Sequence, residues 1–158
     1  MTNFDRTIQM LLVEDNPADA WLLKEMIFRW TNQVQIKLIT DGEEAEKYLQ
    51  EDVATQKATR PDVIILDLNL PKVDGRVLLK EIRMNDALSS IPVFILTSSS
   101  LESDKKQCEA SQADLYLTKP SDLTEFVQLV QHLVDVDIPV AMERGHVVDR
   151  SMQRALGL

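Results

Sequence analysis

Five side chains that can handle a charged oxygen group each follow directly after a largely apolar run of the sequence. They are Glu14 and Asp15 after the run 8–13, Asp67 after 62–66, Thr97 after 91–96 and Lys119 after 114–118. Apolar, β-branched runs of this length are typical of strands buried inside a parallel sheet. Ligand sites of such sheets collect at the carboxyl ends of the strands. If the runs are neighbouring strands, we expect three carboxylates, a hydroxyl and an amine to meet in one pocket.

These residue types together are suited to phosphoryl transfer. Three clustered carboxylates repel one another, and a divalent cation relieves that repulsion. Ligands that are all oxygen favour Mg²⁺ or Mn²⁺. A bound Mg²⁺ would bridge to one phosphoryl oxygen, Lys119 would neutralise a second and the Thr97 hydroxyl would donate to a third. Asp67, in the middle of the set, is the natural nucleophile.

Each of these residues also has an ordinary structural role. Asp15 could cap the first helix, and Asp67 could be a turn residue at the end of a strand. Thr97 begins a Thr-Ser-Ser-Ser run typical of a loop, and a lone lysine such as Lys119 is usually solvated. The prediction of a site therefore depends on their conjunction, in which four strand candidates place acid, acid, hydroxyl and amine at the same end of a sheet.

The segments between these runs have the patterns of helices. Helices are predicted over 17–30, with Asn16 as N-cap, and after the capping box Asp41–Glu44. A third helix is predicted over 76–84, and a fourth over 101–110, where the apolar residues are few beyond Leu101 and Cys108. Ser121 is predicted to cap the last helix. Residues 34–39 alternate like an edge strand, 51–60 is predicted as a loop, and Gly75 is expected to free the backbone of a turn. Five strand–helix units predict an α/β fold, a flavodoxin-like doubly wound parallel sheet of order 2-1-3-4-5 with helices on both faces.

The composition bounds the class of protein. The 158 residues, 44% of them hydrophobic, suffice for one domain with a real core. A formal charge of −9 without a basic cluster argues against nucleic acid and anionic membrane as ligands. Cys108 is the only cysteine, so no intramolecular disulfide can form, and the two histidines lie far apart, which argues against a zinc site. Without a signal peptide or a membrane-spanning run, the expected location is the cytoplasm.

The sequence resembles the response-regulator receiver domains of two-component signalling over about residues 7–135. The matching motifs are Leu12-Val13-Glu14-Asp15-Asn16, Asp67-Leu68-Asn69-Leu70-Pro71-Lys72-Val73-Asp74-Gly75, Leu96-Thr97-Ser98 and Tyr116-Leu117-Thr118-Lys119-Pro120. The resemblance implies that Asp67 accepts a phosphoryl group from a sensor histidine kinase. It also implies that Glu14, Asp15, Asp67 and the Asn69 carbonyl hold Mg²⁺. Thr97 and Tyr116 would be the switch residues, and Lys119–Pro120 would be a cis peptide.

A narrower resemblance is to the single-domain regulators paired with cyanobacterial and bacterial phytochromes. It is carried by Glu-Asp-Asn-Pro-Ala-Asp at 14–19, by the segment 51–60 that ends before Pro61-Asp62, and by Asp-Leu-Asn-Leu-Pro at 67–71. Ser98 departs from the alanine of many receivers, a small change that should leave the pocket intact. The expected division is a receiver domain, 1–135, and a tail, 136–158, that is either disordered or an arm that packs on the last helix or on a second copy.

Three other functions compete with a phosphoryl-accepting switch. A Mg²⁺-dependent hydrolase that forms an aspartyl phosphate, as in the haloacid dehalogenase-like group, would need an acid where Asn69 stands. A binding-only pseudo-receiver would not need the acid, hydroxyl and amine positions that are all present. An FMN carrier is disfavoured because no phosphate-binding loop follows the first run. We therefore expect a signalling phosphoacceptor and not an enzyme, acting at most on its own phosphoryl group.

The output of such a switch must be a contact with another chain. Phosphorylation is expected to draw Thr97 inward, let Tyr116 rotate into the space, and change the face built from 101–110, the fifth strand and the last helix. The last helix carries Phe126 and further apolar residues on more than one narrow stripe. We predict a homodimer through this helix and the fifth strand, which the tail residues Val148, Met152 and Leu156 could extend. The downstream protein partner is not indicated.

Overall fold

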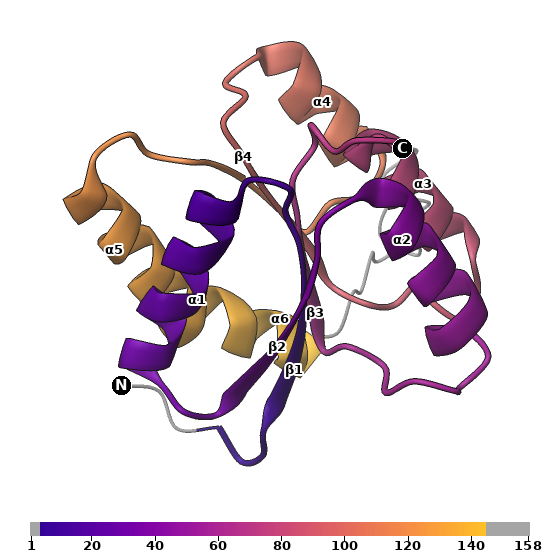
Figure 1. The fold of residues 1–158 in the computed structure, drawn as a ribbon, viewed down its shortest axis with the longest axis horizontal. Coiled ribbons are helices and arrows are strands. Elements are labelled where there is room, and N and C mark those ends of the chain that lie inside the picture. The colour runs from indigo at the N-terminus through magenta and orange to yellow at the C-terminus, as the bar shows by residue number, and fades with distance from the viewer. Residues whose placement is uncertain (1–3, 145–158) are drawn as a thin grey trace.

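A five-stranded parallel sheet forms the centre of the molecule, in a computed structural model that describes residues 4–144. The strands follow the predicted order β2-β1-β3-β4-β5 (Figure 1), which confirms the flavodoxin-like fold. They are β1 (Ile8–Val13), β2 (Val34–Ile39), β3 (Val63–Leu66), β4 (Val93–Thr97) and β5 (Leu115–Thr118). β1, β3 and β4 are almost completely buried, whereas β2 alternates between buried and exposed positions as an edge strand does.

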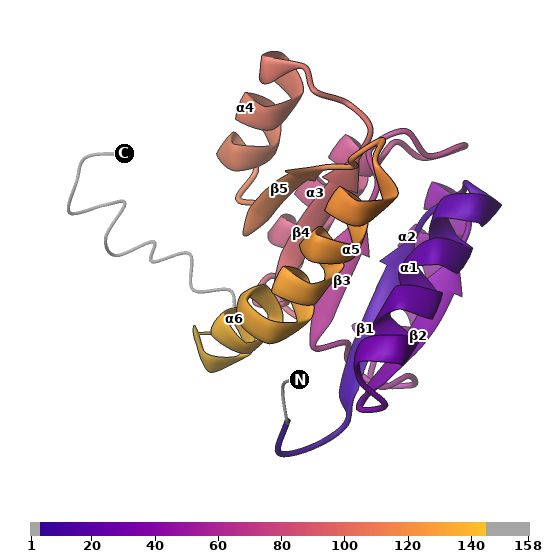
Figure 2. The same cartoon turned by 90° about the vertical axis from the view of Figure 1, so that its left-hand side faces the viewer.

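Helices cover both faces of this sheet. They are α1 (Pro17–Trp30), α2 (Gly42–Lys47) with a π-helical extension η1 (Tyr48–Val53), α3 (Gly75–Met84), α4 (Glu102–Ala110), α5 (Leu123–His132) with a π-helical turn η2 (Leu133–Asp137), and α6 (Ile138–Arg144). Figures 1 and 2 show α1, α5 and α6 on one side of the sheet and α2 and α3 on the other.

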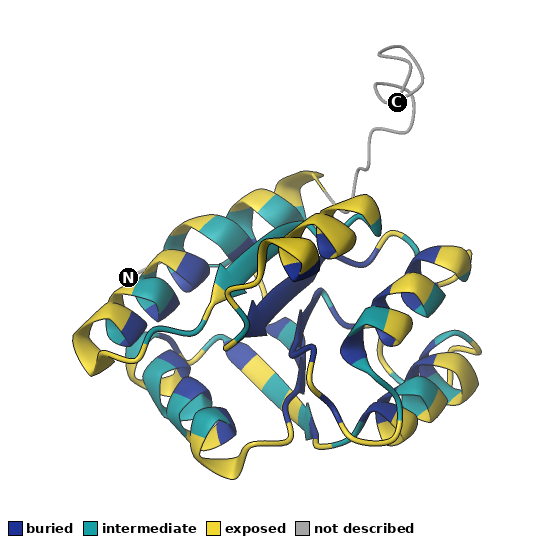
Figure 3. Ribbon diagram, turned by 90° about the horizontal axis from the view of Figure 1, so that it is seen from above, coloured by how far each residue is buried: buried dark blue, intermediate teal, exposed yellow. Residues whose placement is uncertain are grey.

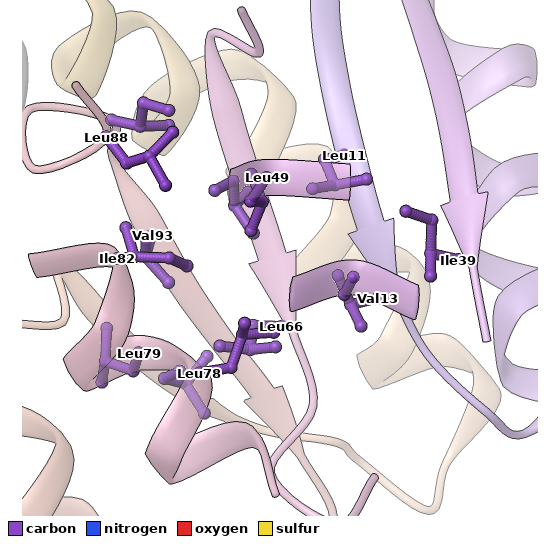
Figure 4. Packing of buried hydrophobic residues seen from close by; sticks show 14 of the residues in the cluster. Leu11, Val13, Ile39, Leu49, Leu66, Leu78, Leu79, Ile82, Leu88 and Val93 are labelled. Atoms are coloured by element: carbon purple, nitrogen blue, oxygen red, sulfur yellow. The ribbon is translucent and has the colours of Figure 1, made fainter. Parts of the chain in front are cut away.

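The period of two along each strand divides the core between the two faces. In β1, Leu11 and Val13 point toward α2 and α3, while Met10 and Leu12 point toward α1 and α5. Figure 4 shows the first of these two clusters, in which Leu79 of α3 packs with strand residues. Figure 3 shows the result from above, with exposed positions on the outer sides of the helices and buried ones in the middle strands. The sheet is therefore held firmly at the strand ends where the predicted site residues begin.

Side chains cap the helix starts, in two of three cases as predicted. The Asn16 carboxamide oxygen accepts from the amides of the first turn of α1, and the Asp41 carboxylate accepts from the Glu44 amide at 2.7 Å. The prediction that Ser121 caps the last helix is wrong. Asp122 does so, accepting from the Glu125 amide at 3.1 Å, because the helix starts one residue later than expected.

Two segments are more helical than the sequence predicted. The segment 51–60 is not a loop throughout, since η1 continues α2 to Val53 and buries that side chain in the core. The last helix does not end at 135, where the tail was expected to start. It continues through η2 and α6 to Arg144, and Ile138 is fully buried in the core on the α1 side. The apolar tail residues Val147, Val148, Met152 and Leu156 lie outside the described residues.

No helix among residues 4–144 is long and apolar enough to cross a membrane.

Candidate functional site

The strand register brings the predicted site residues to one edge of the sheet. Val13 pairs with Leu66 between β1 and β3, so the residues that follow, Glu14 and Asp67, are neighbours. The backbone ladder continues one step beyond the strands: the Asp67 amide donates to the Val13 carbonyl at 3.1 Å. On the other side, the Lys119 amide donates to the Thr97 carbonyl at 2.7 Å. Hydrogen bonds of the main chain thus fix the backbone from which each of these side chains projects.

The Asp67 carboxylate is buried, and its two oxygens have different partners. Oδ1 accepts from the Leu68 amide at 2.7 Å and, at 3.4 Å, from the Asn69 amide. Oδ2 accepts from the Lys119 ammonium at 3.0 Å. Burial opposes ionisation of Asp67, but the charge and hydrogen bond of Lys119, helped by the Thr97 hydroxyl, outweigh it and lower the pKa below its ordinary value. Asp67 is therefore a carboxylate at neutral pH, with one oxygen held by the backbone and the other facing an ammonium group.

Lys119 is the centre of the charged cluster. Its ammonium donates to Glu14 at 2.8 Å, to Asp19 at 2.9 Å and to Asp67 at 3.0 Å. Burial alone would lower the pKa of Lys119, but these carboxylates raise it above its ordinary value, so the group is charged. The Lys119–Pro120 peptide bond is trans, as are all the peptide bonds within residues 4–144. The expectation of a cis bond at this position is wrong.

Glu14 responds in the opposite direction from Asp67, although both share the same ammonium. Burial, with the negative charge of Asp67, raises the pKa of Glu14 to about 7 against the effect of Lys119 and of the Asn16 amide, which donates to Oε1 at 3.0 Å. One ammonium cannot compensate two buried carboxylates fully, which is why the pKa of Glu14 remains raised. A divalent cation would supply the missing positive charge.

The carboxylates of Glu14, Asp15 and Asp67 are suitably arranged for a cation. One oxygen from each lies within 4.8 Å of the other two. Glu14 and Asp67 are buried, and Asp15 is exposed, which leaves the group open to solvent on one side. A donor set of carboxylate oxygens without histidine or cysteine suits Mg²⁺ or Mn²⁺. Asn69, whose carbonyl was predicted as a further ligand, is exposed at the same end of β3, and its role as a ligand stays a prediction.

Gly75 allows α3 to begin against the backbone of Asp67. A Cβ atom at this position would lie 2.2 Å from the Asp67 carbonyl oxygen, a distance that no side chain can occupy. The Gly75 amide donates to the Leu68 carbonyl at 2.9 Å and so closes the turn. The backbone freedom expected of Gly75 is found instead at Lys72, which has a φ of 69°. Gly75 is needed for close approach and not for a left-handed conformation.

Comparison with known proteins agrees with this geometry. Residues 10–131 match the response regulator receiver domain family. The chain belongs to this family. The response regulator Rcp1 of Synechocystis sp. is 39% identical over 122 residues, which cover 77% of this chain and 83% of Rcp1.

Two solved structures extend the likeness to the fold. The Mn²⁺-bound form of Rcp1 has a TM-score of 0.77 at 37% identity, covering 83% of this receiver and 94% of that chain. The phosphorylated cyanobacterial phytochrome response regulator RcpA has a TM-score of 0.75 at 36% identity, covering 82% and 94%. The receiver is thus similar over most of its length to regulators of this type.

The two predicted switch residues of the receiver lie beside the loop between β4 and α4. Thr97 is fully buried at the end of β4, and its hydroxyl oxygen accepts from the Ser99 amide at 3.4 Å. Tyr116 is partly buried in β5, and its hydroxyl donates to the Ser99 carbonyl at 3.0 Å. Both residues therefore contact Ser99, so the loop that carries it connects them.

Three charged residues of the receiver that sequence reasoning missed also belong to this region. Asp19 of α1 contacts Lys119, as described above. Arg76 of α3 pairs with Asp104 of α4 at 2.8 Å, and the Ser99 hydroxyl donates to the other Asp104 oxygen at 2.6 Å. The position of Asp19 in the first turn of a helix that starts beside Asp15 could have signalled its place. No pattern in the sequence signals the pairing of Arg76 with Asp104, which depends on how α3 and α4 meet.

Proposed function

We propose that this receiver is a phosphorylation-controlled signalling switch in which Asp67 accepts a phosphoryl group from a sensor histidine kinase. The observation that carries the proposal is the asymmetric environment of the Asp67 carboxylate. Oδ1 is held by the Leu68 amide at 2.7 Å, while Oδ2 faces the Lys119 ammonium at 3.0 Å. A nucleophile oriented in this way presents one oxygen to the phosphoryl donor, and the Lys119 ammonium beside it can stabilise the negative charge of the arriving phosphoryl group.

The transfer forms one bond and breaks another. A bond forms between phosphorus and Asp67 Oδ2, and the bond between phosphorus and the kinase histidine nitrogen breaks, leaving its electron pair on the imidazole. Lys119 is charged throughout because its pKa is raised, and it would pass its hydrogen bond from Oδ2 to a phosphoryl oxygen. Thr97 is assigned the second contact to the phosphoryl group through its hydroxyl.

A divalent cation is part of the proposal. Glu14, Asp15, Asp67 and the Asn69 carbonyl would hold it, and Rcp1, a relative, has a Mn²⁺-bound form. Mg²⁺ is the expected cation because it accepts few carboxylates together with water and phosphate oxygens. When bound, it would neutralise charge on the phosphoryl oxygens. The protein's part is to keep Glu14 close to Asp67 although their charges repel, which the pKa of Glu14, raised to about 7, reflects.

The kinase is proposed to be of the phytochrome type. Support comes from RcpA, described as a cyanobacterial phytochrome response regulator, which is 36% identical and covers 82% of this chain. Phosphorylation of the purified receiver by a bacterial phytochrome kinase, compared with a kinase from another signalling pair, would test this part separately. Equal or slower transfer from the phytochrome kinase would contradict it.

The output is proposed to run through Thr97, Tyr116 and α4. Negative charge on Asp67 would draw the Thr97 hydroxyl inward, away from the Ser99 amide at 3.4 Å. The Ser99 loop would then move, and with it the Tyr116 hydroxyl that donates to the Ser99 carbonyl. Hydrogen exchange of free and phosphorylated receiver should differ most in α4 and β5; a difference confined to α1 and α2 would contradict this route.

The contact made by the output is proposed to be a homodimer through α5 and the β5 edge. Leu123 at the start of α5 is 59% exposed, and Val136 and Val140 are 43% exposed further along the same helical run. Phe126 is 5% exposed within one chain, so Phe126→Asp would disturb the core and is unsuited as a probe. Light scattering of wild type and Leu123→Asp tests the dimer. A monomer mass for the wild type, with and without phosphorylation, would contradict it.

The experiment that tests the central assignment is labelling by acetyl phosphate in the presence of Mg²⁺. Intact mass should show one added phosphoryl group that is lost in mild base, and Asp67→Asn should abolish it. Omitting Mg²⁺, or replacing Asp15 by Ala, should slow the reaction strongly. Unchanged labelling of Asp67→Asn would exclude Asp67 as the acceptor, and no labelling of the wild type would favour a binding-only receiver.

A further inference from the structure

The Lys119 ammonium has three carboxylate partners, and one of them has no part in the proposed transfer. Asp67 is the proposed acceptor and Glu14 a proposed metal ligand, whereas Asp19 of α1, at 2.9 Å, is neither. Asp19 is also the most accessible of the three, with a side chain 38% exposed against 5% for Glu14 and 7% for Asp67. A solvated acid would not need this partner, so its contact with a buried lysine requires an explanation.

The donors of the ammonium group are fully used. A lysine has three N–H donors, and Lys119 directs them to Glu14, Asp19 and Asp67 at 2.8, 2.9 and 3.0 Å. In the proposed reaction the Asp67 bond passes to the phosphoryl group, and Glu14 turns to the cation. The bond to Asp19 is the one that can persist through the whole cycle. It would hold the ammonium in place while its other two partners change.

Asp19 is itself held firmly by the start of α1. Its amide donates to the Asn16 carboxamide oxygen at 3.1 Å, and the Asn16 amide donates to Glu14 Oε1 at 3.0 Å. Since Lys119 bridges Glu14 and Asp19, the four residues close a ring of hydrogen bonds. The first turn of a helix also stabilises a carboxylate through the helix dipole. The ring thus joins the end of β1, the first turn of α1 and the residue after β5.

We propose that Asp19 is a positioning residue for Lys119, which keeps the ammonium beside Asp67 during phosphoryl transfer. The inference rests on the proposed roles of Asp67 and Lys119. Asp19 acts through Lys119 and does not touch the phosphoryl group. A residue of this kind makes the transfer faster because the stabilising charge is in place before the phosphoryl group arrives.

The alternative is that Asp19 contributes only its negative charge, and the two roles predict effects of opposite sign. The phosphoryl donor is an anion, so removing a nearby negative charge should speed its reaction if charge alone matters. Loss of a positioning contact should slow the reaction, because the ammonium is then less well placed. Asp19→Asn removes the charge and keeps the size of the side chain. Asp19→Glu keeps the charge and moves the carboxylate by one methylene.

The test compares the initial rate of labelling by acetyl phosphate with Mg²⁺ in wild type, Asp19→Asn, Asp19→Glu and, as a matched control on the same helix, Glu25→Gln. Asp19→Asn should react about tenfold more slowly, which corresponds to the loss of one charge-assisted hydrogen bond. Asp19→Glu should lie between Asp19→Asn and wild type, and Glu25→Gln should equal wild type. A rate for Asp19→Asn equal to or above that of wild type would overturn the proposal. So would an Asp19→Glu rate equal to wild type, a comparison that serves even if Asp19→Asn does not fold.

A second readout is independent of the reaction. The side-chain ¹⁵N signal of the Lys119 ammonium, identified by its loss in Lys119→Gln, should exchange faster with water in Asp19→Asn than in wild type or Glu25→Gln. An unchanged exchange rate would show that Asp19 does not hold the ammonium. Failure of the proposed function has a different signature, since wild type would then remain unlabelled or Asp67→Asn would still be labelled.

Discussion

Helices α3 and α4 follow successive strands and pack on the same core cluster, yet they are attached to it by different forces. α3 buries Leu78, Leu79 and Ile82 and starts at an Asp74 cap that accepts from the Arg76 amide. α4 buries only Asp104 and Cys108, and its N-cap residue, Leu101, makes no capping hydrogen bond with its side chain. Leu101, expected from the sequence to anchor α4, is 64% exposed.

Polar contacts take the place of apolar ones in α4. Asp104 accepts from Arg76 of α3 at 2.8 Å and from the Ser99 hydroxyl at 2.6 Å. Charged and hydroxyl groups can exchange such partners for water or for one another at small net cost, whereas buried leucines cannot leave the core without a large one. α4 is therefore the helix that can shift while α3 stays, and α3 is the fixed support against which Asp67 is held through Gly75.

The largest expected effect is on the free energy of unfolding, and it tests whether α3 is attached to the core more firmly than α4. Leu79→Ala in α3, at a position with no exposure, should lower the free energy of unfolding by about 2–5 kcal/mol. Cys108→Ala, at the one buried apolar position of α4, should cost only about 1 kcal/mol because less apolar surface is lost. Urea unfolding followed by circular dichroism measures both. Val77→Ala, on the exposed side of α3, is the control and should change little; equal losses for Leu79→Ala and Cys108→Ala would refute the comparison.

The next effect concerns the polar attachment of α4. Asp104→Asn keeps the shape of the side chain but loses the ion pair with Arg76, and should cost about 1–2 kcal/mol. Hydrogen exchange should quicken in α4 and remain slow in α3, because the lost ion pair attaches α4 to α3, whereas α3 keeps its buried leucines. Glu102→Gln, an exposed substitution in the first turn of α4, should leave exchange unchanged. If α3 loosened as much as α4, the two helices would form one unit and the proposed switch would need a different moving part.

The difference between the helices also explains what the sequence could predict. Apolar runs that end in Asp67 or in Glu14-Asp15 mark both the strands and the polar edge, because strand burial and the position of ligand sites follow from general rules. The sheet order and the gathering of the site residues could therefore be predicted. α3 has the same kind of signal in its buried leucines, and its limits differ from the prediction by one residue.

Contacts between charged side chains could not be predicted in this way. Whether Asp104 meets Arg76, or Asp19 meets Lys119, depends on helix positions and rotamers that no periodicity encodes. The same holds for Gly75, where the sequence indicates a special backbone position but not that the reason is the nearby Asp67 carbonyl. The helix after residue 135 was missed because acidic residues interrupt its apolar pattern, although Ile138 is buried in the core.

A smaller effect concerns Glu81 of α3, a partly buried carboxyl group whose ionisation is unfavourable. Burial, together with the Glu46 carboxyl of α2, raises the pKa of Glu81 from its ordinary 4.5 to about 7. The native chain then binds more protons at Glu81 than the unfolded chain does between these pH values, so the stability that Glu81 contributes is fully present below about 4.5 and is lost as the pH rises to about 7. Glu81→Gln should flatten this fall relative to wild type in urea titrations at several pH values. Glu43→Gln, exposed on α2, is the control; a profile unchanged by Glu81→Gln would assign the fall to Glu14, whose pKa is also raised to about 7.

The smallest expected effect is the loss of the hydroxyl of Tyr116, and it tests how α4 is connected to the site. This hydroxyl donates to the Ser99 carbonyl at 3.0 Å, and the Thr118 hydroxyl lies 3.5 Å from the same oxygen. Because the site is partly exposed and the oxygen keeps another donor or water, Tyr116→Phe should cost at most about 1 kcal/mol. Its mark should instead be local, as faster hydrogen exchange in the Ser99 loop and at the start of α4, with α3 unaffected. Tyr48→Phe deletes the same group in η1 and should not change that loop. If hydrogen exchange in the Ser99 loop of Tyr116→Phe were as slow as in wild type, the hydroxyl would not be the connection. The ring of Tyr116 would then have to transmit any movement of Thr97 to α4.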